Sequence, residues 1–110
     1  MNFKNKTKAY EKQSRIYGSY TRVTSNDVNS RYYYQSNFAS GYYGIWSCGT
    51  EWYVGGESDK GKCIGAANSN SNTEKCVHDI GFDWKYFDSP NLSDAGEGLA
   101  VKCLYEHGNC

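Results

Sequence analysis

The apolar residues Leu, Ile, Val and Phe are scarce in this sequence of 110 residues, in which they together number 16. A share this low is typical of disordered chains. Disordered chains also lack aromatic residues and carry a high net charge, whereas this chain has 11 Tyr, 3 Trp and a formal net charge of zero. We therefore predict one small folded domain with an aromatic core, because the chain is too short for a second core.

The sequence also lacks a charge bias and a long apolar run. The 12 Lys and Arg residues balance the 12 Asp and Glu residues, which argues against nucleic acid or a membrane surface as the partner. No apolar run approaches the ~18–20 residues of a membrane helix, and the residues before Tyr10 lack the apolar segment of a signal peptide. We expect a soluble mature domain or fragment that does not insert into a membrane.

Catalytic signatures are missing as well. The chain has two histidines, His78 and His107, and no Gly-x-Ser-x-Gly motif that would mark a nucleophilic serine. The glycines of Gly96-Glu97-Gly98 lack the third glycine of a dinucleotide-binding loop, and no phosphate-binding lysine motif is present. We predict that the protein is not an enzyme and needs no cofactor.

Short strands are predicted from residue 16 onward, because no window repeats apolar residues at helical spacing and the 12 Gly are scattered. Gly49-Thr50 separates two aromatic runs in the manner of a tight hairpin turn. We expect an all-β fold, a small antiparallel β-sandwich or barrel of about six or seven strands stapled by disulfides. The predicted strands span residues 16–23, 31–35, 42–48, 51–54, 82–86 and 98–104.

Alternation along these segments also predicts which side chains point into the core. In 82–86 the Phe, Trp and Tyr residues share one face, and 98–104 is predicted to be the closing strand. The run 68–73 contains only Asn, Ser and Thr, so we expect an exposed loop there. The predicted core side chains are Trp46, Trp84, Tyr86, Leu99 and Val101.

Positive charge is concentrated at the start of the chain. Residues 1–31 hold seven Lys and Arg against Glu11 and Asp27, and the remainder carries the opposite excess. We predict a basic N-terminal tail over residues 1–15 and a single β domain over residues 16–110. The tail either lies across the acidic body or stays solvated, which we favour, or it is a mobile arm that contacts anionic surfaces.

Five cysteines in a short chain are typical of a secreted domain reinforced by disulfides. We predict a Cys63–Cys76 bridge across the polar loop and a Cys48–Cys103 bridge from an early strand to the last one. An odd count leaves one cysteine over. Cys110, the last residue, is predicted to be a free thiol or to link a disulfide-bonded homodimer.

Two metals are weighed against this disulfide interpretation. Zinc has candidate ligands in Cys103-x3-His107-x2-Cys110 and Cys76-x-His78, but the spacings match no standard finger. Calcium has a series of aspartates, yet nothing resembles an EF-hand loop. Disulfides account for the same cysteines and solvated strand surfaces for the aspartates, so no metal site is predicted. The aspartates are Asp79, Asp83, Asp88 and Asp94.

A series of short motifs runs through residues 16–104 and resembles a known type of domain. The motifs are Gly18-x-Tyr20, Asn29-x-Arg31 followed by Tyr34, Tyr43-Gly44-Ile45-Trp46, Trp52-x-Val54-Gly55, a cysteine pair, Trp84-x-Tyr86 and Leu99-x-Val101-x-Cys103. This pattern resembles a small extracellular Trp/Tyr/Cys-rich module of secreted and cell-surface proteins of invertebrates and lower chordates. The resemblance implies an extracellular setting and no particular activity.

Exposed aromatic rings carry the functional hypothesis. In a strand, Tyr33 must point to the face opposite Tyr32 and Tyr34. The pairs Tyr42-Tyr43 and Trp52-Tyr53 likewise place one ring on each face, so one ring of each pair is expected to be exposed. We expect a secreted, lectin-like binding module that recognises a glycan or an extracellular protein. Its predicted ligand-binding residues are Tyr33, Tyr42, Trp52 and Tyr53.

An alternative interpretation is an adhesive matrix protein, cross-linked through tyrosine and lysine surfaces and an intermolecular disulfide. Eleven Tyr and 12 Gly fit that composition, and alternating strands argue for a defined fold in either case. The sequons at Asn5 and Asn91 predict a secreted glycoprotein, with both sites in exposed chain.

Overall fold

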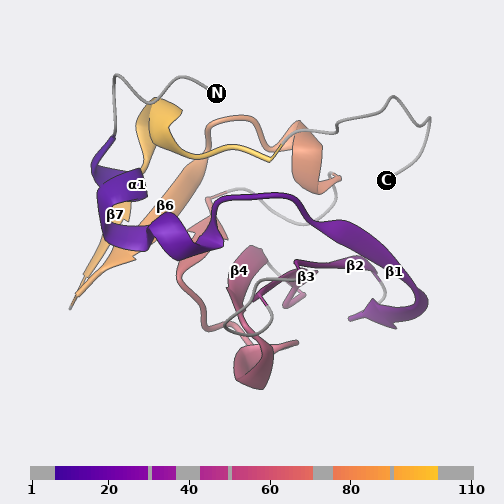
Figure 1. Cartoon of the computed structure of the whole chain (residues 1–110). Helices are drawn as coiled ribbons and strands as arrows, with labels where there is room; N and C mark the ends of the chain where they lie inside the picture. The colour runs from indigo at the N-terminus through magenta and orange to yellow at the C-terminus, as the bar shows by residue number, and fades with distance from the viewer. Residues whose placement is uncertain are drawn as a thin grey trace.

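Seven strands form one antiparallel sheet in a computed structural model that describes residues 7–29, 31–36, 43–49, 51–70, 76–89 and 91–101 (Figure 1). Each strand pairs with the next one along the chain, so the order in the sheet equals the order in the sequence. The all-β prediction is confirmed; the sheet is open, and closure into a sandwich or barrel stays a prediction. The strands are β1 (Thr21–Val28), β2 (Arg31–Gln35), β3 (Tyr43–Ser47), β4 (Trp52–Gly56), β5 (Ala67–Ser69), β6 (Trp84–Asp88) and β7 (Asn91–Asp94).

Short helical elements connect and flank these strands. None of the helices in the described ranges is long and apolar enough to cross a membrane. The elements are the α-helix α1 (Lys8–Gln13) and the 3-10 turns η1 (Ser14–Ile16), η2 (Glu57–Asp59), η3 (Val77–Asp79) and η4 (Gly96–Gly98).

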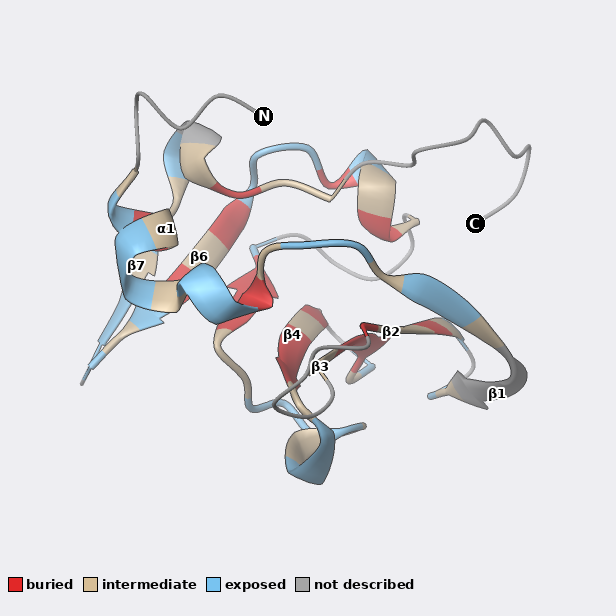
Figure 2. Ribbon diagram, in the orientation of Figure 1, coloured by how far each residue is buried: buried red, intermediate tan, exposed pale blue. Residues whose placement is uncertain are grey.

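One face of the sheet, here called the inner face, carries the main core. Ile45, Val54 and Ala67 are opposite one another on β3, β4 and β5, and all three are buried. Residues from outside the sheet cover this face, and Figure 2 shows the buried residues gathered along β4 and β6. Burial of each large apolar side chain stabilises the fold by about 1.5–3 kcal/mol. The other core residues are Ile16, Trp52, Val77, Ile80, Trp84 and Leu99.

The predicted core residues are buried or half-buried, most of them on the inner face and Trp46 on the opposite face of the sheet. Trp46, Trp84, Tyr86 and Leu99 are buried, and Val101 is half-buried against the core. Trp84 is completely buried, and within the described residues its Nε1 has no hydrogen-bond acceptor. An unsatisfied buried donor costs about 1–3 kcal/mol, an amount comparable to the gain from burying the ring.

The polar run at 68–73 was predicted to be an exposed loop, and this is wrong for its first two residues. Asn68 and Ser69 belong to β5 and are buried, whereas Asn70 is exposed and residues 71–73 lie outside the described ranges. The ladders to β4 and β6 satisfy the backbone of β5, and Ser69 Oγ accepts a hydrogen bond from the Trp52 amide at 3.0 Å. Polar side chains are tolerated in the sheet interior because their hydrogen bonds are made there.

The predicted closing strand is also wrong over its described part. Residues 99–101 are not in a strand, and the last strand in the described part of the chain is β7, which follows β6. Leu99 points into the core from outside the sheet, so an inward-facing pattern arises there without a ladder. At the other predicted strands, residues 16–20 lie outside β1, and Phe82 precedes β6 with half of its surface exposed (50%).

The described part of the predicted basic tail is helix α1, which packs on β6. Thr7 caps this helix, since its Oγ1 accepts a hydrogen bond from the Tyr10 amide at 3.2 Å. The Lys12 ammonium lies 3.8 Å from the Asp88 carboxylate, and Gln13 Nε2 donates to the Phe87 carbonyl at 2.7 Å. The described part of the basic segment, residues 7–15, therefore packs on β6; the position of the tail as a whole stays a prediction. Surface ion pairs contribute about 1 kcal/mol at most, so buried Ala9 and Ile16 anchor the described part.

The approach of Gly44 to the Tyr33 ring gives a first prediction. A Cβ at Gly44 would lie 2.7 Å from Tyr33 Cε1, closer than carbon atoms can pack. We expect Gly44→Ala to lower the free energy of unfolding by about 1–3 kcal/mol, as overpacking does. Gly56→Ala is the matched control, because Gly56 is opposite Tyr43 on the next strand and a Cβ there meets nothing within 4 Å. Equal denaturant midpoints for the two variants would contradict the packing of Tyr33.

Tyr20 gives a second prediction. Burial raises the pKa of Tyr20 above its ordinary value of 10.0, and its hydroxyl donates to the Ile16 carbonyl at 2.6 Å. The unfolded chain therefore loses this proton before the folded chain does, so stability is full below pH ~10 and falls as the pH rises above it. We expect Tyr20→Phe to unfold more easily at neutral pH, by about 1 kcal/mol for the lost hydrogen bond, but to lose less stability at alkaline pH. Urea unfolding across that pH range measures both effects, and an unchanged alkaline slope would contradict the assignment.

Candidate recognition face and disulfide clamp

Two of the four predicted ligand-binding residues are wrong because they are buried. Trp52 belongs to the main core, and Tyr33 is covered on the opposite face, each with 2% of its surface exposed. Tyr42 lies outside the described residues, and Tyr53 is half-buried. Every tyrosine in the described ranges is buried or half-buried. With so few aliphatic residues, the chain uses its rings as core, so they do not form the broad exposed aromatic surface expected from composition.

Tyr33 faces away from Tyr34 as predicted, but the face on which it lies is covered. We call this the outer face; it also carries Trp46, which is two residues beyond Gly44 on β3. Lys60, in the loop after η2, has its Nζ 4.9 Å from the centre of the Tyr33 ring. Burial, and then the negative charge of Glu57, raises the pKa of Tyr33. The loop thus closes over the ring and keeps its hydroxyl neutral.

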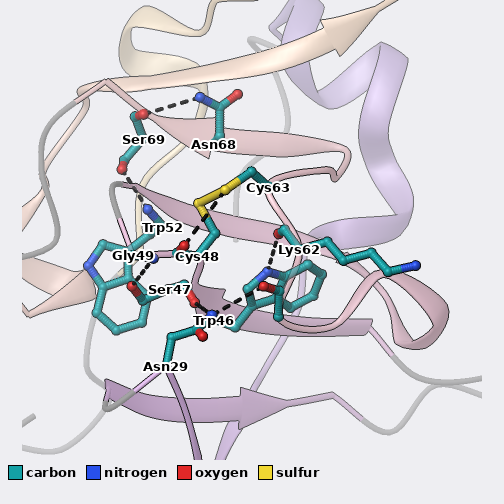
Figure 3. The surroundings of a disulfide bond; sticks show 11 residues. Asn29, Trp46, Ser47, Cys48, Gly49, Trp52, Lys62, Cys63, Asn68 and Ser69 are labelled. Atoms are coloured by element: carbon teal, nitrogen blue, oxygen red, sulfur yellow. Dashed lines mark hydrogen bonds between the residues drawn. A yellow bond between two sulfur atoms is a disulfide. The ribbon is translucent and has the colours of Figure 1, made fainter.

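The loop of residues 57–66 folds back over Trp46 (Figure 3). Trp46 is fully buried, and its Nε1 donates a hydrogen bond to the Lys62 carbonyl at 2.8 Å. Asn29 Nδ2 donates to the Ser47 carbonyl at 2.7 Å and to the Gly61 carbonyl at 3.1 Å, so one side chain joins β3 to the loop. These contacts make the outer face of β2 and β3 a second, small aromatic core.

A disulfide between Cys48 and Cys63 clamps this loop (Figure 3). Cys48 follows β3, Cys63 lies in the loop, and their Cα atoms are 5.2 Å apart. The predicted Cys63–Cys76 and Cys48–Cys103 bridges are therefore wrong. The first was inferred from an exposed loop at 68–73, but the β5 strand that forms there separates the two cysteines. The second assumed that a strand at 98–104 closes the sheet.

Cys76 also forms a disulfide, and its partner lies outside the described residues because Cys48 and Cys63 bond to each other. Cys103 and Cys110 are outside the described ranges, so the prediction of a free or intermolecular thiol at Cys110 stays a prediction.

Cys76, His78 and Asp79 form a cluster with the geometry of a partial metal site. Their ligand atoms lie within 4.8 Å of one another, and His78 Nε2 is 3.5 Å from Asp79 Oδ1. A zinc site uses cysteine as the thiolate, which an oxidised Cys76 does not supply. His78 and Asp79 remain as two ligands, fewer than a structural site needs.

The part of the outer face that the loop leaves open carries a row of polar side chains around one tyrosine. Tyr53, Asn68, Lys85 and Asp94 are opposite one another on β4, β5, β6 and β7. Three steps of about 4.8 Å between strands give the row a length of ~14 Å. Tyr53 and Lys85 are half-buried and Asp94 is exposed, whereas Asn68 is buried and its Nδ2 donates a hydrogen bond to the Ser69 carbonyl at 3.2 Å. We call these four residues the outer-face row.

Two apolar side chains flank the outer-face row. Phe87 on β6 and Leu92 on β7 are opposite each other, and 41% and 49% of their respective surfaces are exposed. Alternation along β6 contained the signal for this face, since Lys85 and Phe87 must share the side opposite to buried Trp84 and Tyr86. Asn68 and Asp94 had no such signal, because β5 and β7 were not predicted as strands. Asn91, the described sequon, is exposed at the start of β7, and Asn5 lies outside the described residues.

Comparison with known proteins finds no matching family model, no matching curated protein and no matching solved structure. The resemblance to extracellular Trp/Tyr/Cys-rich modules therefore stays an expectation drawn from the motifs.

The disulfide clamp yields a third prediction. Replacing both cysteines, Cys48→Ser with Cys63→Ser, is expected to lower the free energy of unfolding by about 3 kcal/mol, the chain-entropy value for a closed loop of this size. Trp46 becomes accessible as the loop loosens, so an acrylamide quencher should reduce tryptophan fluorescence more strongly than in the unaltered protein. Peptide mapping without reduction should join the Cys48 peptide to the Cys63 peptide. A map that joins Cys63 to Cys76 would contradict the clamp.

Proposed function

We propose that the protein is a non-catalytic extracellular binding module, and that its ligand is a glycan bound along the outer-face row. The observation that carries the proposal is the alignment of a half-buried aromatic ring, an ammonium and an exposed carboxylate on one face of the sheet, with the buried amide of Asn68 between the ring and the ammonium. Sugars present flat apolar faces and rings of hydroxyl groups, which these side chains match in type.

Each residue of the row has a distinct role in this proposal. Tyr53 offers one face of its ring for stacking, and burial together with Glu51 raises the pKa of its hydroxyl, which stays protonated and able to donate. Asn68 is buried between Tyr53 and Lys85, and the hydrogen bond from its Nδ2 to the Ser69 carbonyl, drawn in Figure 3, holds its side chain in the middle of the row, where it has a positioning role. Lys85 donates and Asp94 accepts, which gives the site both kinds of hydrogen-bonding group.

An extracellular location is supported by the disulfide chemistry. The Cys48–Cys63 bond and the disulfide state of Cys76 mean that all three described cysteines are oxidised. Disulfides persist in oxidising compartments and are rare in the cytosol. The adhesive matrix alternative has less support, because it needs exposed tyrosines and the described tyrosines are buried or half-buried.

Glycan binding is the fourth prediction, tested with a glycan array followed by titration of the best ligand. We expect Tyr53→Leu to weaken binding roughly two- to tenfold, because an aromatic contact contributes about 0.5–1.5 kcal/mol beyond its area. Asp94→Asn should weaken it as well, by removing a charged acceptor without changing shape.

Tyr32→Leu is the matched control, because Tyr32 is also half-buried but lies on β2 beneath the Arg22 guanidinium, 3.4 Å from its ring centre. Its affinity for the glycan should equal that of the unaltered protein. An array without any bound glycan would overturn the proposal. Equal losses in Tyr53→Leu and Tyr32→Leu would show that the effect is one of stability.

A further inference from the structure

Strand β7 is one of the two edges of the sheet that the described residues form, and its residues Asn91, Leu92 and Asp94 are exposed. The Ala95 amide donates to the Trp84 carbonyl at 2.9 Å, so these opposed residues form a hydrogen-bonded pair. Pairs alternate along an antiparallel ladder, which makes Phe87 and Leu92 a non-hydrogen-bonded pair. The Phe87 amide accordingly donates to Ala66, on the other side of β6, at 2.7 Å. The amides and carbonyls of Leu92 and Asp94 therefore point away from β6, toward the free edge.

The two edges of the sheet differ in how they are protected. The pairing of β1 with β2 is interrupted between Arg22 and Asp27, and irregular, charged edges resist further pairing. The pairing of β7 with β6 runs without interruption from Asp88 and Asn91 to Lys85 and Asp94. In the described part of the chain, no hydrogen bond reaches the outward backbone groups of Leu92 or Asp94. Of the two edges, β7 is therefore the one whose backbone amides and carbonyls can pair with another strand.

We propose that β7 pairs antiparallel with β7 of a second copy of this chain, with Leu92 facing Leu92 across a two-fold axis. Facing residues of an antiparallel pair share one face of the sheet, so this register aligns Phe87, Leu92 and the same two residues of the second copy in one apolar row. Pairing of the two copies therefore partly buries Phe87 and Leu92, the two large apolar side chains that are exposed on the outer face of β6 and β7. The same strand sequence on both sides makes the contact self-complementary, which an unrelated segment does not provide.

Charge is compatible with this partner. Asp94 is the acidic residue of β7 on the outer face, and it lies opposite Lys85 within its own copy. In the proposed register the two Asp94 residues lie four residues apart along the joined strands, about 14 Å, which is beyond the Debye length of ~8 Å at physiological salt. Lys85 offsets the charge of Asp94 within each copy, and salt screens the two Asp94 carboxylates from each other, so they do not oppose association.

The contact is small, because β7 has four residues. Interfaces below ~1,200 Å² belong to weak, transient complexes, so the dimer is expected to form and dissociate with concentration. The joined sheet has fourteen strands, twice the seven of one copy, and presents two outer-face rows on the same side. This self-association does not depend on the proposed glycan binding, although two rows on one sheet would bind a repeating ligand more tightly than one row.

Sedimentation equilibrium of the unaltered, disulfide-bonded protein tests the dimer from about 10 μM to about 1 mM, the range expected for a small interface. The mass should rise toward that of two chains, and the Leu92 amide should exchange more slowly with deuterium at the higher concentration. A gel run without reductant in denaturant should show a single chain. A monomer at every concentration, or a dimer that survives denaturant and so is covalent, would overturn the proposal.

A matched pair of variants locates the contact. Leu92→Lys and Ile64→Lys each replace an exposed aliphatic residue by lysine at similarly exposed positions, with 49% and 57% of the residue surface exposed. Leu92→Lys brings two ammonium groups together across the two-fold axis and should weaken association at least tenfold, whereas Ile64→Lys should leave it within twofold. Equal thermal midpoints show that both variants are folded. Association that is unchanged in Leu92→Lys, or protection of Leu92 only after another protein is added, would rule out a second copy as the partner.

Glycan titration of Leu92→Lys separates the two proposals. If Tyr53→Leu loses glycan binding and still dimerises, the edge contact stands on its own. If Leu92→Lys remains monomeric and binds glycan through a single row, the row functions without the dimer.

Discussion

The loop of residues 57–66, held over Trp46 and Tyr33, is the constraint on which the rest of this structure depends. A single sheet has two faces, and each must be covered or soluble. The inner face is covered by residues from η1, η3 and the chain around Leu99. Within the described ranges, the loop is what covers the outer face at β2 and β3. The Trp46 bond to Lys62, the Asn29 bonds and the Cys48–Cys63 disulfide hold it there.

This arrangement explains where a tyrosine-rich chain places its aromatic rings. With few aliphatic residues available, rings fill both the main core and the small core under the loop. Glycine permits the second core, since the Tyr33 ring lies against Gly44, and Gly55 and Gly65 approach each other so closely that a Cβ on Gly55 would lie 3.1 Å from Gly65 Cα. What remains for a ligand is the end of the outer face beyond the loop, where a polar row and one ring replace the broad aromatic surface.

The face and the edge of β7 have different physical consequences. The face offers side chains, which can distinguish ligands by shape and hydrogen bonding. The edge offers backbone groups, which pair with any suitable strand, so specificity must come from flanking side chains such as Phe87 and Leu92. A sheet whose strands follow chain order leaves its first and last strands at the edges. Because β7 pairs regularly with β6, it is the edge strand better able to pair with a further strand.

The sequence alone determined the all-β class, the hairpin at Gly49 and the burial of Trp46, Trp84, Tyr86 and Leu99, because side-chain alternation and turn residues act locally. Only the tertiary structure decided which face of the sheet was open. Burial of Tyr33 depends on a loop that begins more than twenty residues later in the chain. Strand β5 exists because two neighbouring strands satisfy its backbone, and the Cys48–Cys63 pairing depends on the path of that same loop. Such long-range contacts leave no local pattern in the sequence, and they decided the disulfide and the candidate site.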